Sequence, residues 1–309
     1  MVADGVLIEA SGLVKRFGTF TAVDGIDVQV RAGEAFGFLG PNGAGKSSTM
    51  RMIGCVSAPS GGTLRILGLD PLRDGPRIRA RLGVCPQQDS LDFELTLLEN
   101  LTVYARYFGM PRKVARERAL ELLEFMQLAD RAMEKVEPLS GGMKRRLTIA
   151  RALVNEPDIV LLDEPTTGLD PQARHLVWER LFRLKQRGVT LVLTTHYMDE
   201  AEQLCDRLVV MDGGRIVAEG SPRELIERYS TREVLEVRFA GELEPFAGKL
   251  DGVGERIEVL PDRLLVYVSD GDAAAAEVHR RQLAPSSTLV RRSTLEDVFL
   301  HLTGRTLVE

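Results

Sequence analysis

A glycine-rich run that ends in a lysine and two serines is the first segment of this chain whose residues could do chemistry. The run consists of Gly40, Pro41, Asn42, Gly43, Ala44, Gly45, Lys46, Ser47 and Ser48, and it fits the pattern G-x-x-x-x-G-K-[ST]. Glycines let successive backbone N–H groups curl around phosphate oxygens, and a helix that follows adds the positive end of its dipole. We therefore expect Lys46 to reach the β- and γ-phosphates of a nucleotide and Ser47 to bind Mg²⁺.

Two acidic residues follow an apolar stretch at residues 159–162. Such a stretch predicts a buried parallel strand, which places Asp163 at the carboxyl edge of its sheet. From there Asp163 can hold a metal through water, and Glu164 can polarise an attacking water molecule. Exposed acids at an ordinary strand end are the alternative for these two residues alone. Beside the glycine-rich run, they indicate the second half of a nucleotide site.

A pair of glycines lies roughly twenty residues before Asp163. Ser140 is a good helix N-cap, and Gly141 and Gly142 leave backbone N–H groups exposed at the start of a helix. By themselves these residues predict only a second anion-binding turn. In this order with the two earlier segments, they resemble the signature sequence of ABC ATPases, with Met143 where many relatives have glutamine.

The remaining motifs of ABC ATPases follow in order, and the resemblance implies a role for each. Phe17 stands where this family has an aromatic ring, often tyrosine, that stacks on adenine, and Gln87 matches the glutamine that senses the γ-phosphate. Asp170 matches the loop that crosses the dimer interface, and His196 matches the histidine that contacts the γ-phosphate. In isolation each has an ordinary alternative: a core phenylalanine, an exposed loop amide, a helix cap and a strand-end histidine.

The resemblance implies ATP and Mg²⁺ as cofactors and a site built from two chains. The glycine-rich run of one chain and the signature of another enclose ATP in this family, so a homodimer is expected. The implied catalytic residues are Lys46, Glu164 and His196. The implied metal ligands are Ser47, Gln87 and Asp163. The other implied nucleotide contacts are Phe17, residues 40–48, Ser140, Gly141, Gly142 and Asp170.

Residues 173–180, 197–202 and 295–300 resemble the daunorubicin-resistance and nodulation-factor export ATPases. This narrower resemblance implies efflux of an amphipathic substrate, such as a drug, a lipid or a lipo-oligosaccharide. A separate multi-span permease is implied as the partner, docked near Gln87 with residues 89–96 as the candidate contact. The chain is then expected at the cytoplasmic face of the cell membrane. An importer ATPase and a soluble ABC protein outside transport are the alternatives.

The pattern of elements predicts an α/β fold, an ABC-type P-loop ATPase core with a helical insertion. Expected buried strands at 35–39, 158–163 and 190–195 belong to the core, and residues 90–152 form the helical insertion. We expect an ATPase domain over residues 1–229 and a small C-terminal α+β domain over 230–309. In the latter, a capping box of Ser293 and Glu296 opens a final helix through residue 302.

Composition and charge exclude several classes of protein. The chain has 309 residues, is 44% apolar, and carries 40 basic against 45 acidic side chains, a formal charge of −5. These values exclude a wholly disordered or fibrous chain and give no reason to expect a nucleic-acid partner. No apolar run approaches the roughly 18 residues of a membrane span. We interpret the basic run at 144–146 as a helix face.

Overall fold

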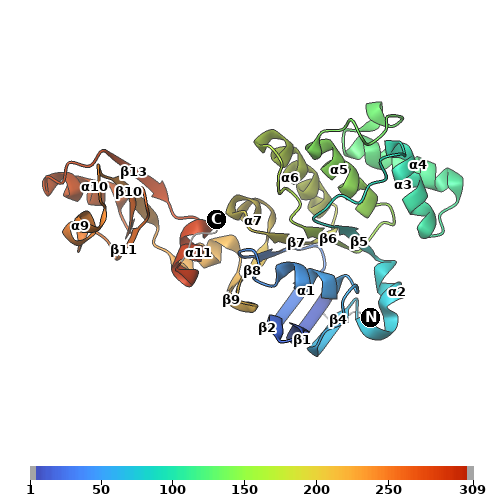
Figure 1. Cartoon of the computed structure of the whole chain (residues 1–309), viewed down its shortest axis with the longest axis horizontal. Coiled ribbons are helices and arrows are strands. Elements are labelled where there is room, and N and C mark those ends of the chain that lie inside the picture. The colour runs from blue at the N-terminus through green and yellow to red at the C-terminus, as the bar shows by residue number, and fades with distance from the viewer. Residues whose placement is uncertain (1–4, 305–309) are drawn as a thin grey trace. The chain divides into compact units, whose positions relative to one another are not determined.

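The computed structural model describes residues 5–304 of the chain, which divides into two compact units between Glu219 and Gly220 (Figure 1). The boundary expected from the sequence lies ten residues later, after residue 229, so the helix at Pro222–Tyr229 belongs to the second unit. Residues 1–4 and 305–309, the outer ends of the two expected domains, lie outside the described residues.

The centre of the first unit is a six-stranded sheet in the order β5-β6-β7-β3-β8-β9. Its strands are β3 (Ala35–Leu39), β5 (Leu82–Cys85), β6 (Ile159–Asp163), β7 (Thr190–Thr195), β8 (Arg207–Asp212) and β9 (Arg215–Gly220). Strands β5, β6, β7, β3 and β8 pair in parallel, and β3 and β7 are buried throughout. Leu39 pairs with Thr195, and Asp163 pairs with Thr194. The segments that follow these three strands therefore leave the sheet at one edge.

A second, antiparallel sheet of the first unit has the order β2-β1-β4. Its strands are β1 (Val6–Phe17), β2 (Phe20–Arg31) and β4 (Gly61–Ile66). Apolar side chains from both sheets and from α1 (Lys46–Ile53) share one core, which includes Ile8, Leu13, Phe36, Phe38 and Met52. This core fixes α1, and with it the end of the glycine-rich run, against the parallel sheet.

Helices cover the rest of the first unit. Between β4 and β6 lie α2 (Pro71–Arg79), α3 (Leu97–Tyr107), α4 (Arg112–Phe125), a short 3₁₀ turn (Ala129–Arg131) and α5 (Gly141–Ala152). Helices α3, α4 and α5 contact one another and form the helical insertion expected from the sequence (Figure 1). Two further helices, α6 (Pro171–Gln186) and α7 (Met198–Leu204), flank β7 in the sequence.

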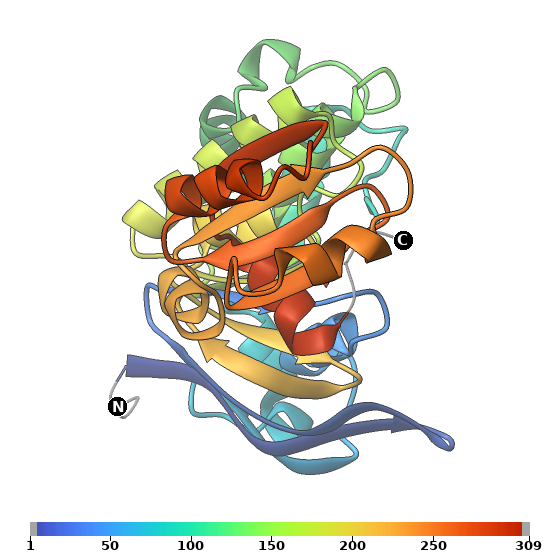
Figure 2. The same cartoon turned by 90° about the vertical axis from the view of Figure 1, so that its left-hand side faces the viewer.

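The second unit is a four-stranded antiparallel sheet in the order β11-β12-β10-β13, with helices on it (Figure 2). Its elements are α8 (Pro222–Tyr229), β10 (Glu233–Arg238), α9 (Glu244–Ala247), a 3₁₀ turn (Gly248–Leu250), β11 (Arg256–Val259), β12 (Leu264–Val268), α10 (Gly271–Arg280), β13 (Ser287–Arg292) and α11 (Leu295–Thr303). From β10 to β13 the order of elements is β-α-β-β-α-β, the split βαβ arrangement. One sheet face packs on α10, and Leu300 of α11 packs on the other.

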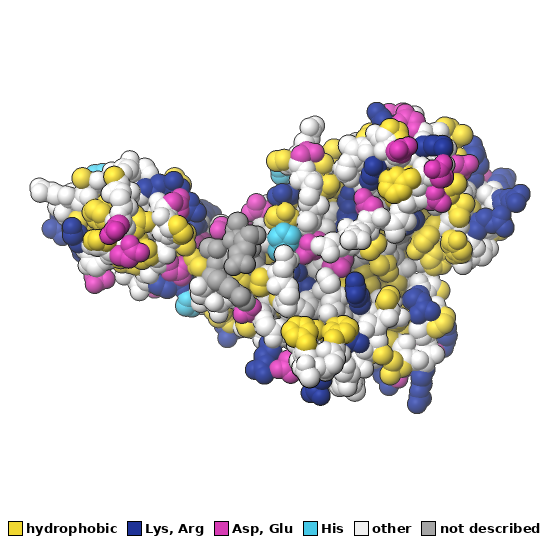
Figure 3. All heavy atoms as spheres, viewed as in Figure 1, with side chains coloured by type: hydrophobic (Ala, Val, Ile, Leu, Met, Phe, Trp, Pro, Cys, Tyr) yellow, Lys and Arg dark blue, Asp and Glu magenta, His cyan; other side chains and the backbone are white. Residues whose placement is uncertain are grey.

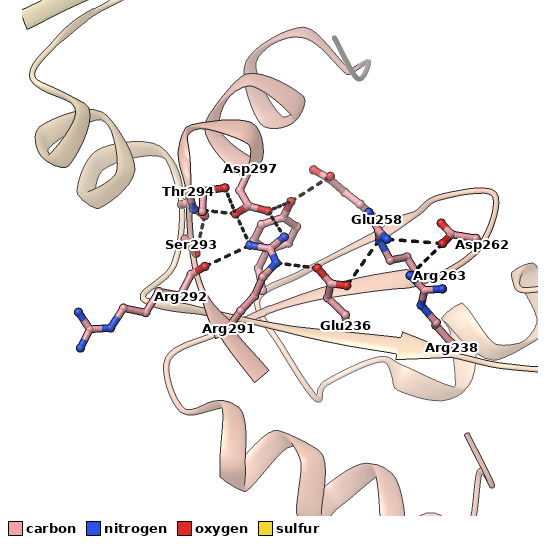
Figure 4. A network of polar contacts seen from close by, with 12 residues as sticks. Glu236, Arg238, Glu258, Asp262, Arg263, Arg291, Arg292, Ser293, Thr294 and Asp297 are labelled. Atoms are coloured by element: carbon pink, nitrogen blue, oxygen red, sulfur yellow. Dashed lines mark hydrogen bonds and ion pairs between the residues drawn. The ribbon is translucent and has the colours of Figure 1, made fainter. Parts of the chain in front are cut away.

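The capping box expected at Ser293 and Glu296 is wrong by one residue. The N-cap of α11 is Thr294, whose backbone N–H and hydroxyl both donate to the Asp297 carboxylate, at 2.8 and 3.2 Å. Arg291 also donates to Asp297, at 2.7 Å, as Figure 4 shows. Thr294 and Asp297 fit the capping-box pattern one position after Ser293 and Glu296. The ion pair between Arg291 and Asp297 favours this second pair.

No helix within residues 5–304 combines the length and the apolar character that crossing a membrane requires.

Candidate active site

The glycine-rich run leads from the end of β3 into α1 and is shaped by close packing. Gly45, the N-cap of α1, has a φ of 101°, in the left-handed region that favours glycine. A Cβ atom at Gly45 would also lie 2.4 Å from the carbonyl oxygen of Ala22. No other residue fits this position, because both the backbone conformation and the space exclude a side chain. The N-terminus of α1 therefore has no side-chain cap, which leaves its N–H groups free for an anion.

Lys46 is buried, with 4% of the residue exposed, and its ammonium group folds back over the glycine-rich run. Nζ donates to the carbonyl oxygens of Gly40 at 2.6 Å and Pro41 at 3.0 Å. It lies 3.9 Å from Oε1 of Glu164. Burial lowers the pKa of Lys46, and the charges of Glu164 and Asp163 oppose that change. The lysine therefore lies between the run and the two carboxylates at the end of β6.

Ser47 and Asp163 place a hydroxyl and a carboxylate side by side. The Ser47 hydroxyl donates to Oδ1 of Asp163 at 3.1 Å, and the Thr194 hydroxyl donates to the same oxygen at 2.5 Å. Hydroxyl and carboxylate oxygens are the hard donors that Mg²⁺ prefers. The donor set at the end of β6 and the start of α1 therefore fits a magnesium ion.

Glu164 is the centre of the polar contacts at this edge of the sheet. Gln87 donates to its Oε2 at 3.0 Å, and Nδ1 of His196 lies 3.3 Å from its Oε1. The contact with His196 is the largest cause that lowers the pKa of this carboxyl, against the effect of its burial. Glu164 therefore stays ionised at neutral pH and can act as a hydrogen-bond acceptor or a base. Gln87, expected as a metal ligand, contacts Glu164 in this structure.

Arg145 is a residue of the site that the sequence analysis missed. The basic run at 144–146 was interpreted as a helix face, but only 5% of Arg145 is exposed. Its guanidinium donates to the backbone carbonyls of Asp163 at 2.8 Å, Glu164 at 3.1 Å and Pro165 at 2.7 Å. It also donates to the carbonyl of Gln87 at 3.3 Å. Arg145 thus connects the segment after β6 to the loop after β5. In the sequence, the one indication of this role was that Arg145 lies close to the glycine pair at Gly141 and Gly142.

The signature residues and Asp170 form a second group at the starts of α5 and α6. Ser140 caps α5 by accepting from the N–H of Met143 at 3.3 Å, and Asp170 caps α6 by accepting from Ala173 at 2.9 Å. A Cβ atom on Gly142 would lie 2.6 Å from the Cβ of Ala173, so glycine is needed where the two helices meet. Both predicted helix caps are confirmed. Ser140, Gly141 and Asp170 are exposed, which leaves this group accessible.

Phe17 lies at the end of β1, where it pairs with Phe20 across the hairpin. Half of the residue is exposed, 51%, and Nζ of Lys15 lies 5.0 Å from the ring centroid. The alternative of a core phenylalanine is therefore excluded. An exposed ring beside a cation suits stacking on a nucleotide base.

Known proteins match this chain along almost its full length. The "ABC transporter" family model matches residues 23–167, and the model "Nodulation factor export protein NodI, C-terminal domain" matches residues 244–304. The Nod factor export ATP-binding protein I of Cupriavidus metallidurans is 46% identical over 97% of this chain and 98% of that protein. The protein of that name from Paraburkholderia xenovorans is 49% identical over 96% and 97%. The chain belongs to the Nod factor export ATP-binding protein I family.

Solved structures agree with this assignment for the ATPase part. A dimeric post-hydrolysis state of the ATP-binding cassette MJ0796, bound to ADP and Pi, is 30% identical with a TM-score of 0.64, and it covers 70% of this chain and 98% of that one. The cbiO1 protein of Clostridium perfringens, part of the cbiONQ complex, is 27% identical with a TM-score of 0.68, covering 73% and 92%. The expected family, the cassette fold and the ATPase activity are thereby confirmed. As a family member, the chain is the ATP-hydrolysing subunit of an ABC exporter.

Proposed function

We propose that Glu164 is the general base that activates water for attack on the γ-phosphate of ATP. The observation that carries this proposal is the position of its carboxylate, 3.3 Å from Nδ1 of His196 and 3.0 Å from Nε2 of Gln87. Its lowered pKa keeps the carboxylate ionised, which a base requires. His196 and Gln87 then contact the γ-phosphate, so that they orient both the phosphate and the attacking water.

The other residues at this edge of the sheet bind and orient the phosphates in this proposal. The backbone N–H groups at the uncapped start of α1 and the ammonium of Lys46 hold the β- and γ-phosphates. Ser47, Asp163 and Gln87 would hold Mg²⁺, which when bound neutralises charge on the phosphates. Phe17 stacks on the adenine. Catalysis of this kind is mostly positioning and charge stabilisation.

We infer that two copies of the chain complete the site. Ser140, Gly141 and Asp170 are accessible at the starts of α5 and α6, in a group apart from the contacts around Glu164, and Gly142 is buried where the two helices meet. In the homodimer these residues face the nucleotide held by the partner copy. The dimeric state of the similar cassette MJ0796 supports this arrangement.

We propose that a cytoplasmic segment of the permease docks in an apolar groove of the first unit. The groove, with a volume of about 740 Å³, lies between β5, the end of α2 and α3. It is lined by Val84, Tyr104, Tyr107, Phe108 and Met110, and Figure 3 shows hydrophobic side chains on this part of the surface. Val84, which lines the groove, lies only three residues before Gln87 in the sequence, so an occupant of the groove can act on the Gln87 loop. Residues 89–96, the contact expected from the sequence, do not line it.

Tyr107→Glu tests the groove, because Tyr107 is 81% exposed and a charge at this position stays in solvent. We expect basal ATPase activity to stay within about twofold of wild type, while ATP-driven transport in vesicles with the permease falls about tenfold. Val114→Glu is the control, since Val114 is exposed on α4 and does not line the groove. Equal loss of transport in both variants would contradict the assignment.

We propose that the cargo is an amphipathic lipo-oligosaccharide, exported from the cytoplasmic face of the membrane. Relatives at 46–49% identity are named Nod factor export proteins, and their similarity includes the second unit. These names favour export over the alternatives of an importer ATPase and a soluble ABC protein outside transport.

Glu164→Gln tests the proposed mechanism, because it keeps the shape of the side chain and removes the base. We expect ATP binding to persist, turnover to fall by about a hundredfold or more, and a closed homodimer to accumulate with ATP. Glu156→Gln is the control, since that exposed glutamate lies at the opposite end of β6. Wild-type turnover in Glu164→Gln, measured as phosphate release, would refute the role of Glu164.

A further inference from the structure

Glu200 is a buried acid that the mechanism above does not use. It lies in α7, is 0% exposed, and accepts two hydrogen bonds at Oε1. The Thr166 hydroxyl donates at 2.7 Å and Nε1 of Trp178 donates at 3.2 Å. Burial raises the pKa of Glu200, and the hydrogen bonds to its carboxylate oppose that change. One carboxyl group thus joins three separate segments of the first unit.

The elements that Glu200 joins flank the residues that perform the chemistry. Thr166 comes two residues after Glu164, and α7, which carries Glu200, begins two residues after His196. Trp178 lies on α6, the helix that begins where the segment after Glu164 ends. The distance of 3.3 Å between Glu164 and His196 depends on the relative placement of these segments. Glu200 is therefore in a position to control the distance between Glu164 and His196 without contacting either residue.

A second contact ties the same elements together nearer the surface. The guanidinium carbon of Arg174 on α6 lies 4.6 Å from the ring centroid of Tyr197, the residue after His196. The same guanidinium lies 6.0 Å from the ring centroid of Trp178. Helix α6 therefore contacts two residues that follow His196, Glu200 through Trp178 and Tyr197 through Arg174.

We propose that Glu200 is a positioning residue for ATP hydrolysis, which holds the segment after Glu164 and helix α7, which follows His196, in one fixed arrangement. The proposal rests on the roles proposed above for Glu164 and His196. Because Thr166 lies on the segment that leads to Asp170, the same link passes movement at the dimer interface to the reacting groups. Glu200 is thus a connection between dimer closure and hydrolysis.

Two substitutions of Glu200 separate this role from simple packing. Glu200→Leu removes the acceptor, so we expect kcat to fall about tenfold while KM for ATP changes by less than about twofold. Glu200→Gln keeps an oxygen that accepts from Thr166 and Trp178, and its amide replaces Oε2, which has no hydrogen-bond partner. We expect this conservative variant to restore at least about half of the wild-type kcat.

Thr166→Val provides a variant that keeps Glu200 itself, with Thr190→Val as its matched control. Both threonines are buried in the first unit. Thr190 lies at the start of β7, at the end away from His196, and its hydroxyl accepts from the N–H of Gly33. We expect Thr166→Val to lower kcat and Thr190→Val to leave it unchanged. Equal kcat in these two variants would overturn the proposal, even if Glu200→Leu does not fold.

Trp178 supplies a direct optical readout, because it is the only tryptophan in the sequence. In the Glu164→Gln background we expect ATP to shift its emission, and Glu200→Leu to abolish the shift while ATP still binds. An unchanged shift would overturn the role of Glu200 and leave that of Glu164 standing. Normal turnover in Glu164→Gln alone would instead refute the proposed function, so the two failures are distinguishable.

Discussion

Two adjacent carboxylates have different environments because different partners reach them. Asp163 accepts hydrogen bonds from the hydroxyl groups of Ser47 and Thr194, and these contacts suit a metal ligand. Glu164 meets Gln87 and His196, and its pKa lies below the ordinary value of 4.5. Since a lowered carboxyl pKa means that the charge is lost only at lower pH, Glu164 remains a base throughout the neutral range.

The Arg145→Lys variant tests how the site depends on a buried guanidinium. Arg145 donates to carbonyls on two loops, and lysine cannot reproduce the planar fork that makes these contacts. We expect a loss of about 2–4 kcal/mol in the free energy of unfolding and a fall of about tenfold in kcat. Urea unfolding and phosphate release measure the two effects.

Arg146→Lys is the matched control for this prediction. Arg146 stands next to Arg145 on α5, and its guanidinium donates to the carbonyls of Met126 and Gln127, away from Glu164. We expect kcat to stay near the wild-type value. If Arg146→Lys lowers kcat as much as Arg145→Lys does, the loss reflects α5 as a whole.

At the scale of elements, the meeting of α5 and α6 explains why the signature contains a second glycine. Both helices begin with a side-chain cap, from Ser140 and Asp170, which the sequence predicted from residue type alone. Residue type alone did not predict how closely the two helix starts pack against each other. Gly142 faces Ala173 at a distance that leaves no room for another methyl group.

Gly142→Ala is therefore expected to destabilise the first unit, although alanine is the better helix former. Its Cβ would lie 2.6 Å from the Cβ of Ala173, and overpacking of this kind costs about 1–3 kcal/mol. Gly141→Ala meets nothing closer than 4.0 Å, so we expect it to leave the melting temperature unchanged or raise it. Similar melting temperatures for the two variants would contradict this account.

At the scale of the whole molecule, the chain consists of two units with separate cores and different architectures. The first has its polar contacts at the edge of a parallel sheet, whereas the second has them on one face of an antiparallel sheet (Figure 4). In the second unit, Arg291 donates to Glu236 at 2.6 Å and to Asp297 at 2.7 Å. Glu236 and Asp297 are 12% and 1% exposed, and Arg291 is the nearest cation to each of these buried carboxylates.

Arg291→Met is expected to unfold the second unit selectively. Removing one partner of a buried ion pair costs about 3–5 kcal/mol, because the remaining charges stay buried without that partner. We expect calorimetry to show a lower transition for the second unit, with ATP binding retained by the first. Arg280→Met is the control, since Arg280 pairs with Glu277 at 2.6 Å but is 75% exposed. A single unchanged transition in Arg291→Met would contradict the prediction.

The sequence by itself determined the features that depend on neighbouring residues. The glycine-rich run before α1, the buried strands at β3, β6 and β7, and the caps at Ser140 and Asp170 all follow from local residue types. The family also followed from the sequence, since the order of the motifs was enough to indicate it. Each of the structural features, unlike the order of the motifs, is encoded within about ten residues, where backbone preference and side-chain type decide the outcome.

Only the tertiary structure decided the features that join distant segments. The antiparallel sheet of β1, β2 and β4 was not expected, and the burial of Arg145 reversed an interpretation based on its charged neighbours. The same holds for the choice of Thr294 over Ser293 as the cap of α11, and for the contacts of Glu200. In each case the deciding contact is an ion pair, hydrogen bond or strand pairing with a partner that folding alone brings close.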